Sequence, residues 1–285
     1  MSERGPGTCE GLAAGSGPAS RVAAYLDAYQ TGPGALPRGP AAGPADLAGA
    51  LGRMRVAHLP FTHATIDAFL PDDMYRAVLR DWPTEAELAP VVLPGSGGAA
   101  RDYVGSRTTK ILEDWGARGA GSPGTGTWKQ VSLALRSPRF VRSLFACFSD
   151  IIDANLASLP GGPRGFPGFK LYLNCDQGAD EALGAHVDAL RKLLTIVIYI
   201  DLEGALTSES PQLWGTTLYQ AEPGSVTPVH FSPNAGHSAG QRISFAANRA
   251  FIMPNDSRAL HGVAGGQDGV VRRALMCGYW LLSER

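Results

Sequence analysis

The sequence predicts an α+β fold, mainly β, in which a β-sandwich or barrel is backed by helices. Before residue 160, apolar residues such as Val141, Leu144 and Phe148 recur at spacings of three and four, the period of a helix that buries one face. After residue 160 this spacing is absent, and short apolar runs are separated by clusters of Gly, Pro, Asn and Asp. A helical half followed by a strand-rich half is typical of a sheet fold supported by helices.

The first 50 residues are expected to be largely flexible, with one short helix. Gly, Pro and Ala occupy 28 of these 50 positions, so few large apolar side chains remain to offset the entropy lost on ordering. The helix is expected over residues 21–30, with Ser20 as its N-cap. We expect residues 51–285 to form one domain, with helical support over residues 71–158 and a β core over residues 167–283.

The domain is expected to open with extended chain and a helix. Two short extended segments fall within residues 55–70, where Pro60 separates them. The helix that follows has Pro71 at its first position, which suits the fixed backbone angle of proline. Asp72 and Asp73 then lie in the first turn, where the helix dipole favours negative charge.

The rest of the domain divides into loops, helices and strands. Residues 94–126 are rich in Gly and Ser and are expected to form irregular loops. Two helices should follow, over residues 128–135 and 140–156. The strand candidates are residues 169–173, 193–200, 216–219, 242–247, 250–253 and 270–282.

Composition excludes several classes of function. Lys and Arg number 25 against 26 Asp and Glu, so the formal charge of -1 gives no electrostatic footprint for nucleic acid or an anionic membrane. The longest apolar run, residues 193–200, is far shorter than the roughly 20 residues of a membrane-spanning helix. The four cysteines form no CxxC pair, which excludes a zinc ribbon and favours a reducing cytoplasm. We therefore expect a cytoplasmic protein that acts on a small molecule, with no nucleic-acid or membrane partner, in an oligomeric state that the sequence leaves open.

One pair of residues suggests a metal site. His186 and Asp188 are two positions apart, so on an extended chain their side chains point the same way. A facial triad for iron(II) needs such a pair and a second histidine from elsewhere. With six histidines and 16 aspartates in 285 residues, such a pair arises by chance roughly one time in three, so alone it also suits a hydrogen-bonded pair at a barrel rim. The context adds weight, because an apolar strand candidate follows at residues 193–200 and His261 lies ahead of an arginine pair.

At this point the sequence resembles the iron(II)- and 2-oxoglutarate-dependent oxygenases, in particular the prolyl-hydroxylase-like group. The resemblance covers roughly three quarters of the chain, from Thr65 to Trp280, and rests on four motifs in the family's order. The family is characterised by a double-stranded β-helix, two antiparallel sheets that form a jelly-roll with the metal near one open end. The four motifs are IDAFLPDDMYRAVLRDWP, LYLNCDQGADEALGAHVDALRKLLTIVIYI, WGTTLY and LHGVAGGQDGVVRRAL.

The resemblance implies that His186, Asp188 and His261 bind iron(II), with 2-oxoglutarate as the cosubstrate. Dioxygen is then the oxidant and ascorbate a candidate reductant. Succinate and carbon dioxide are the products that accompany hydroxylation of an unactivated carbon. The implied substrate is a small molecule, an amino acid or a peptide-type natural-product intermediate. Asp188 favours hydroxylation, because family members that halogenate lack this carboxylate.

The family also uses an arginine for the far carboxylate of 2-oxoglutarate, and Arg272 and Arg273 both match it. In a strand the two face opposite ways. Arg272 shares its face with small residues such as Ala274 and Gly278, which leaves room inside a barrel, whereas Arg273 shares its face with bulky apolar residues suited to packing against helices. We favour Arg272 and keep Arg273 as the alternative.

Tyr172 matches a tyrosine with which the family often hydrogen-bonds 2-oxoglutarate. The 14 residues from Tyr172 to His186 exceed the common spacing, which suggests an insertion around residues 177–182. A half-buried core tyrosine is the alternative reading of this position.

Other polar and aromatic residues have weaker claims. His58 and His63 are expected to be surface or second-layer residues, and His230 and His237 fall in a Gly-, Pro- and Ser-rich segment, residues 222–240, that suits a lid. His230 is a rival to His261 as metal ligand. The alternatives for the remaining residues are an anion site or a solvated turn for Arg191 and Lys192, and a core role rather than a cavity wall for Trp214.

Two other classes of function stay open. One is a cupin-like metal enzyme or binding protein that does not use 2-oxoglutarate. Cupins usually combine closely spaced histidine pairs with a glutamate, a pattern that this chain lacks. The other is a catalytically silent β-domain that acts as an interaction module, against which the complete triad and arginine argue.

Overall fold

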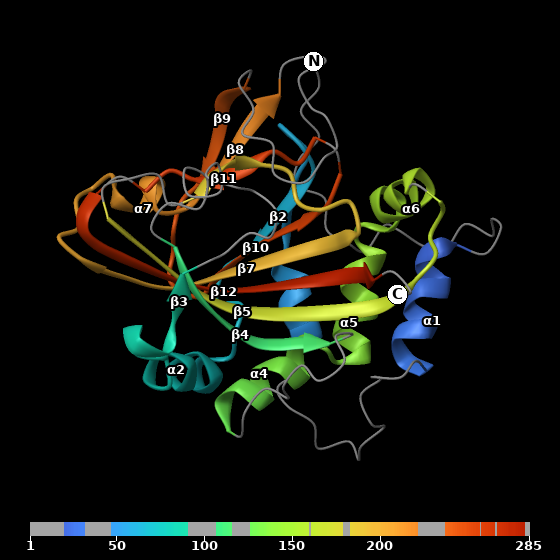
Figure 1. The fold of residues 1–285 in the computed structure, drawn as a ribbon, viewed down its shortest axis with the longest axis horizontal. Helices are drawn as coiled ribbons and strands as arrows, with labels where there is room; N and C mark the ends of the chain where they lie inside the picture. Colours follow the sequence, from blue (N-terminus) through green and yellow to red (C-terminus); the bar gives the residue numbers. More distant parts are fainter. Residues whose placement is uncertain are drawn as a thin grey trace.

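The strands of the protein form two antiparallel sheets. The structure, a computed structural model, describes residues 20–31, 47–90, 107–115, 126–159, 161–178, 183–221, 237–256, 258–265 and 267–282. Within them, eight strands form a large sheet in the order β1-β2-β10-β7-β12-β5-β4-β3. Four strands form a smaller sheet in the order β6-β11-β8-β9. In Figure 1, strands β8, β9 and β11 lie above the large sheet, which runs across the middle of the molecule.

The last eight strands pass back and forth between the two sheets, except that β8 and β9 follow each other within the small one. Strands β5, β7, β10 and β12 belong to the large sheet, and β6, β8, β9 and β11 to the small one. This arrangement of four strands in each of two facing sheets is the double-stranded β-helix, so the predicted fold class is confirmed. The strands are β5 (Phe166–Gly178), β6 (Leu183–His186), β7 (Lys192–Gly204), β8 (Thr216–Ala221), β9 (His237–Ile243), β10 (Arg249–Pro254), β11 (His261–Val263) and β12 (Gln267–Leu282).

The strands of the first half extend the large sheet at its two edges. Strands β1 (Arg55–Ala57) and β2 (His63–Ile66) lie at one edge and confirm the two predicted extended segments. Strands β3 (Ala89–Pro90) and β4 (Thr108–Trp115) lie at the other. The loop expected over residues 94–126 is wrong in its centre, where β4 pairs with β5. Its β-branched residues favour a strand, but the surrounding Gly and Ser conceal that signal.

The strand expected over residues 242–247 lies earlier in the chain. Strand β9 ends at Ile243, and the chain turns at Asn248, whose positive φ of 58° no strand can accommodate. The expected strand included Phe245, which lies outside any strand and stacks its ring on that of Tyr199. Most residues of β9 are polar or small, so apolar content alone misplaces the strand.

The helices confirm the predicted helical half, with two corrections. Helix α2 begins at Asp72, so Pro71 is its N-cap rather than its first residue. The helix expected over residues 140–156 is two helices, because the chain breaks at Cys147 and Phe148. The helices are α1 (Arg21–Thr31), α2 (Asp72–Arg80), α4 (Thr127–Leu135), α5 (Pro138–Ala146), α6 (Ser149–Ser158) and α7 (Ser210–Leu213), with 3-10 turns η2 (Leu47–Arg53) and η3 (Glu85–Glu87). No helix in the described ranges has both the length and the apolar character needed to cross a membrane.

Helix α1 is docked on the core by an acid from another helix. The Ser20 hydroxyl donates a 2.7 Å hydrogen bond to Asp153 of α6, and the Val22 N–H donates one of 2.8 Å to the same carboxylate. Ser20 stands at the predicted N-cap position, directly before α1, and its carbonyl accepts from the Ala24 N–H at 3.2 Å. The side-chain acceptor for the Val22 N–H is Asp153 rather than the Ser20 hydroxyl. Residues 1–19 and 32–46 of the predicted flexible segment lie outside the described residues, and the domain division stays a prediction.

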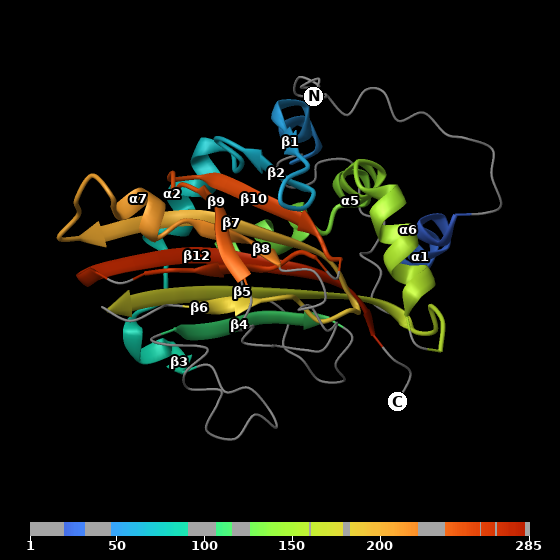
Figure 2. The same cartoon turned by 90° about the horizontal axis from the view of Figure 1, so that it is seen from above.

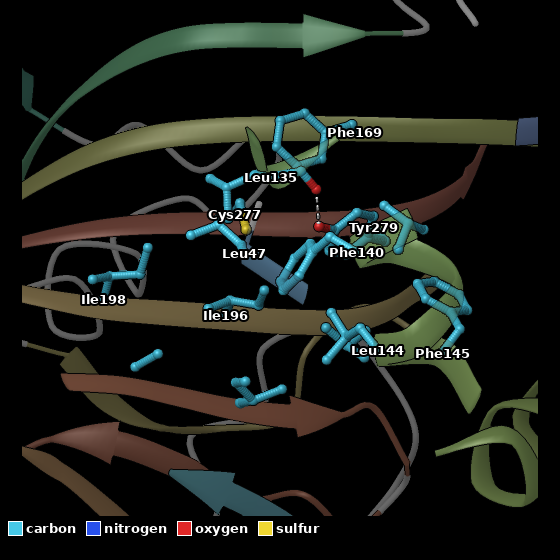
Figure 3. Packing of buried hydrophobic residues seen from close by; sticks show 14 of the residues in the cluster. Leu47, Leu135, Phe140, Leu144, Phe145, Phe169, Ile196, Ile198, Cys277 and Tyr279 are labelled. Atoms are coloured by element: carbon cyan, nitrogen blue, oxygen red, sulfur yellow. Dashed lines mark hydrogen bonds between the residues drawn. The ribbon is translucent and has the colours of Figure 1, made fainter. Parts of the chain in front are cut away.

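The main hydrophobic core lies between the helices and one face of the large sheet. Figure 3 shows Phe140 and Leu144 of α5 beside Ile196 of β7 and Tyr279 of β12. The Tyr279 hydroxyl donates a 2.6 Å hydrogen bond to the carbonyl of Leu135 in α4. In Figure 1, helices α1, α5 and α6 gather at the end of this sheet near the C-terminus. The bulky face of β12 therefore packs against helices, as predicted.

The space between the two sheets is filled only in part. Tyr199 and Phe251 of the large sheet pack there with Leu218 and Ile243 of the small one. In the view of Figure 2, β6 of the small sheet overlies the large sheet near β5. In that region Arg272, Met276 and Trp280 of β12 line a cavity rather than a packed core. The fold thus sets the helices against one face of β12 and the cavity against the other.

Candidate metal centre

Three potential metal ligands meet where the small sheet faces the large one. His186 ends β6 and His261 begins β11, and the two are directly paired between antiparallel strands. Their ring centroids are 4.1 Å apart. The Nε2 atom of His186 is 4.0 Å from Oδ1 of Asp188, and one ligand atom from each of the three residues lies within 4.8 Å of the others. The structure therefore brings together the three residues that the sequence singled out.

A glycine next to His261 allows the two strands to approach. A Cβ atom on Gly262 would stand 2.6 Å from the carbonyl oxygen of Leu183 in β6. Real Cβ atoms do not come that close to an oxygen, so a larger residue would separate β6 from β11. The spacing of the two histidines thus depends on this position.

The two histidines present the same ring nitrogen to the centre. Nδ1 of His186 lies 2.9 Å from the carbonyl oxygen of Gly184, and Nδ1 of His261 lies 2.9 Å from that of Ala259. A carbonyl can only accept, so each Nδ1 carries the proton and each Nε2 keeps its lone pair. Burial lowers the pKa of both imidazoles, and His261 lowers the pKa of His186 further. Both rings are therefore neutral, the form that a metal binds.

Asp188 is held ionised by its neighbours. Its side chain is 9 % exposed, with Lys192 Nζ at 3.0 Å and the Thr195 hydroxyl at 2.7 Å. Burial alone would raise the pKa of Asp188, but Lys192 and the two histidines outweigh it and hold the pKa well below its usual range. The loop that carries Asp188 is held by Asn255, whose Nδ2 donates to the carbonyls of Asp188 and Ala189 at 3.3 and 2.7 Å.

The two histidines open onto a cavity of about 230 Å³ between the sheets. Both sheets contribute its walls. Tyr172 of β5 and Arg272 of β12 line it, so four of the predicted site residues face one space. Other residues that line it are Arg107, Lys192, Val197, Met276 and Trp280.

Arg272 lies in a buried cluster of two arginines and one acid. Its Nη1 atom is 2.5 Å from Oδ2 of Asp176, which is directly paired with it on β5. Arg107 donates to both oxygens of the same carboxylate, at 2.6 and 2.9 Å. Burial alone would raise the pKa of Asp176, but the two guanidinium groups hold it below its usual value. Two cations and one anion leave one buried positive charge, and Arg272 Nε is buried without a hydrogen-bond partner.

Arg273 lies on the opposite face of β12, as the alternation of strand side chains predicted. It forms ion pairs with Asp201 at 3.0 Å and with Glu203 at 2.8 Å, both on the outer end of β7. It does not line the cavity. The sequence could compare Arg272 and Arg273 only by the strand face that each shares. The structure places Arg272 on the cavity and Arg273 away from it.

Sequence reasoning missed Arg107, Asp176 and Asn255. Arg107 stands directly before β4, a strand that was expected to be a loop. Asp176 could have been found by pairing β5 with β12, because it stands opposite Arg272. Asn255 has no local signal, since its partners are carbonyl groups far away in the chain.

The remaining candidates lie elsewhere. His58 is exposed and His63 is buried beside the Phe61 carbonyl, and neither lines the cavity. Trp214 is buried in a core cluster and donates to Gln267 at 3.2 Å, as expected of a core residue. Arg191 donates to the carbonyl of Arg164. His230, most of the proposed insertion at residues 177–182 and most of the proposed lid at residues 222–240 lie outside the described residues, as does the side chain of His237.

Comparison with known proteins gives similar shapes but no close relative. The sequence matches no protein-family model, and no curated protein matches it significantly. A prolyl-4-hydroxylase from Pseudomonas putida has a TM-score of 0.45 and 15% identity over 76% of this chain and 92% of its own. A 2OG-Fe(II) oxygenase family protein from Burkholderia pseudomallei has a TM-score of 0.43 and 13% identity, covering 76% and 84%. SnoN, a non-heme alpha-ketoglutarate-dependent epimerase from nogalamycin biosynthesis, has a TM-score of 0.44 and 12% identity, covering 82% and 81%. These likenesses are low in sequence and shape, so the function has to be inferred from the chain's own site.

Proposed function

We propose that the protein is an iron(II)- and 2-oxoglutarate-dependent oxygenase. The observation that carries the proposal is one cavity lined both by metal ligands and by a buried guanidinium cluster. Two neutral imidazoles and a carboxylate converge on one point, which is the donor set of a facial iron(II) site. A buried guanidinium cluster with one excess positive charge lies on the same cavity. 2-Oxoglutarate, a dicarboxylate, would need the metal for one carboxylate and the guanidinium group for the other.

Some residues of the site would bind the metal and the cosubstrate, and others would orient the binding groups. His186, Asp188 and His261 would hold iron(II) and leave positions on one side of it open. Arg272 would bind the far carboxylate of 2-oxoglutarate, and Tyr172, on the same cavity wall, would donate a hydrogen bond to it. Asp176, itself held by Arg107, fixes the guanidinium of Arg272. Apolar walls, among them Val197 and Met276, exclude water from the reacting groups.

Iron(II) with 2-oxoglutarate and dioxygen supplies the oxidising chemistry. One oxygen atom of dioxygen would end in succinate, with loss of carbon dioxide, and the other would replace a C–H bond of the substrate by C–OH. Dioxygen takes up four electrons, two from 2-oxoglutarate and two from the substrate. Ascorbate would keep the iron reduced between turnovers. We propose hydroxylation rather than halogenation, because Asp188 completes the triad.

The proposed substrate is a small molecule, an amino acid or a peptide-type natural-product intermediate. A cavity of about 230 Å³ accepts a group of small-molecule size. The proposed location is the cytoplasm. A cupin-like metal protein remains the second candidate, and dependence on 2-oxoglutarate separates the two.

The test is an anaerobic titration of the protein with iron(II) and then 2-oxoglutarate. We expect a weak visible absorption band near the green that requires both additions and is lost in His186→Ala and His261→Ala. Iron(II) binding that does not respond to 2-oxoglutarate would instead support the cupin-like alternative. Protein that binds no iron(II) would support the silent module.

Arg272 and Arg273 provide a matched pair for the cosubstrate. We expect Arg272→Ala to raise the concentration of 2-oxoglutarate needed for the band by about tenfold or more, the effect of losing a charge-assisted hydrogen bond. Arg273→Ala should leave it unchanged, because Arg273 faces away from the cavity. If only Arg273→Ala raises that requirement, the cosubstrate binds on the other face of β12.

A further inference from the structure

Lys192 is a buried cation on the wall of the cavity. It begins β7, is 4% exposed, and is paired across the sheet with Trp280 of β12. A Cβ atom on Gly278 would stand 2.8 Å from both Lys192 Cε and Trp280 Nε1. The lysine stem and the indole N–H therefore share a slot over Gly278, which exists because that residue has no side chain.

The indole N–H in this slot has no acceptor, and the ammonium pairs with a ligand of the proposed metal. Trp280 lines the cavity, yet its Nε1–H is buried without a hydrogen-bond partner. A buried donor left unpaired is costly, so such a group in a cavity wall points to a ligand that accepts from it. Lys192 Nζ pairs with Asp188 at 3.0 Å, but that carboxylate is a ligand of the proposed metal.

The charges of the cavity leave Lys192 unbalanced once the proposed groups are bound. Arg107 and Arg272 against Asp176 give one positive charge. Iron(II) with Asp188 gives another, and the two together match the two negative charges of 2-oxoglutarate. The positive charge of Lys192 is then left over. A buried ammonium beside a metal requires a further anion.

From this geometry we propose a second anion subsite, formed by Lys192 Nζ and Trp280 Nε1–H, that binds a carboxylate of the primary substrate. The inference rests on the proposed function and narrows its substrate class to small carboxylic acids, including amino acids. Two donors in one slot match the two oxygens of a carboxylate, and a single cation matches its single charge. Because Lys192 contacts a metal ligand, the subsite holds the acid beside the reacting position.

The test measures binding rather than turnover. The protein is loaded with iron(II) and 2-oxoglutarate without dioxygen, and both loadings are confirmed first. The probes are the protein amino acids and straight-chain monocarboxylates of three to nine carbons, each beside its primary amide. Affinity is measured by calorimetry and by the fluorescence of the protein, to which Trp280 contributes. The variants are Lys192→Met, Lys192→Arg and Trp280→Phe.

Lys170→Met is the matched control. Lys170 Nζ lies 5.3 Å from the centre of the Trp280 ring, close to the 5.8 Å of Lys192, but Lys170 does not line the cavity. We expect at least one acid to bind the loaded protein about tenfold or more tightly than its amide. Lys192→Met should remove that preference, Trp280→Phe should reduce it, and Lys192→Arg and Lys170→Met should keep it.

Three results would overturn the inference while the proposed function stands. The loaded protein could bind no acid of the panel, or Lys192→Met could keep the preference for acids over amides. Alternatively, Lys192→Met could weaken 2-oxoglutarate to the same degree, which would assign Lys192 to the cosubstrate. A protein that takes up neither iron(II) nor 2-oxoglutarate would instead contradict the proposed function itself.

Discussion

Single residues at the centre are held in the charge state that metal binding needs, at a cost to stability in acid. His186 and His261 are neutral because burial lowers the pKa of each. In the unfolded chain the same imidazoles have the ordinary pKa of about 6.5. Acid therefore protonates the unfolded state first, and the folded state is penalised for keeping its imidazoles neutral.

This difference predicts how the metal-free protein responds to pH. Below pH about 6.5 the unfolded chain binds more protons than the folded one, so the free energy of unfolding should fall as pH falls from 7 towards the lowered folded-state pKa values. The double variant His186→Gln, His261→Gln should flatten this dependence, which urea unfolding at several pH values measures. Buried His63, whose pKa burial also lowers, should leave a smaller slope. Equal slopes in variant and wild type would contradict the prediction.

At the scale of elements, the site depends on short strands and on a loop. Long strands β7 and β12 could be predicted because their apolar residues form a continuous local pattern. Strands β6 and β11 have four and three residues, too few for any periodic signal, although they carry both histidines. His261 was selected as a metal ligand from its sequence context, ahead of the arginine pair. The contact of Lys192 with Asp188 depends on the turn between β6 and β7. The pairing of His186 with His261 arises only when β6 and β11 come together in the small sheet, so no local pattern shows it.

The loop that carries Asp188 predicts a role for Asn255. Asn255→Ala removes two hydrogen bonds to this loop, so we expect metal affinity to fall by about tenfold and stability by about 1–3 kcal/mol. Asn248→Ala is the matched control, because Asn248 is buried too and makes two side-chain bonds to Leu70. It should lose at least as much stability, since its φ of 58° also disfavours alanine, but should keep its metal affinity. Metal titration and urea unfolding measure the two effects. If both variants lose metal affinity equally, Asn255 has no specific role in positioning the loop that carries Asp188.

Across the whole molecule, the N-terminal helix is part of the folded body. Val22, Tyr25 and Tyr29 of α1 are buried, and the ring of Tyr25 stacks on that of Phe145 in α5 with centroids 5.2 Å apart. The Tyr25 hydroxyl donates to the carbonyl of Trp280, a residue whose side chain lines the cavity. The composition of the first 50 residues is dominated by the Gly, Pro and Ala around this helix. The sequence therefore indicated where the helix lies but not that it packs on the rest of the domain.

Asp153 should therefore stabilise the whole domain from a single position. It accepts from the hydroxyl of Ser20 and from the backbone N–H of Val22, so Asp153→Ala leaves the first turn of α1 uncapped and undocked. We expect a loss of about 1–2 kcal/mol in the free energy of unfolding, measured with urea, the usual cost of removing an N-cap acceptor. Asp153→Asn keeps an acceptor oxygen and should lose less. Asp150→Ala removes an exposed acid from the first turn of α6, the helix that also carries Asp153. It should lower the free energy of unfolding by well under 1 kcal/mol. If Asp153→Ala costs no more than Asp150→Ala, α1 contributes little to the stability of the domain, and the early expectation of a loosely held N-terminal segment would stand.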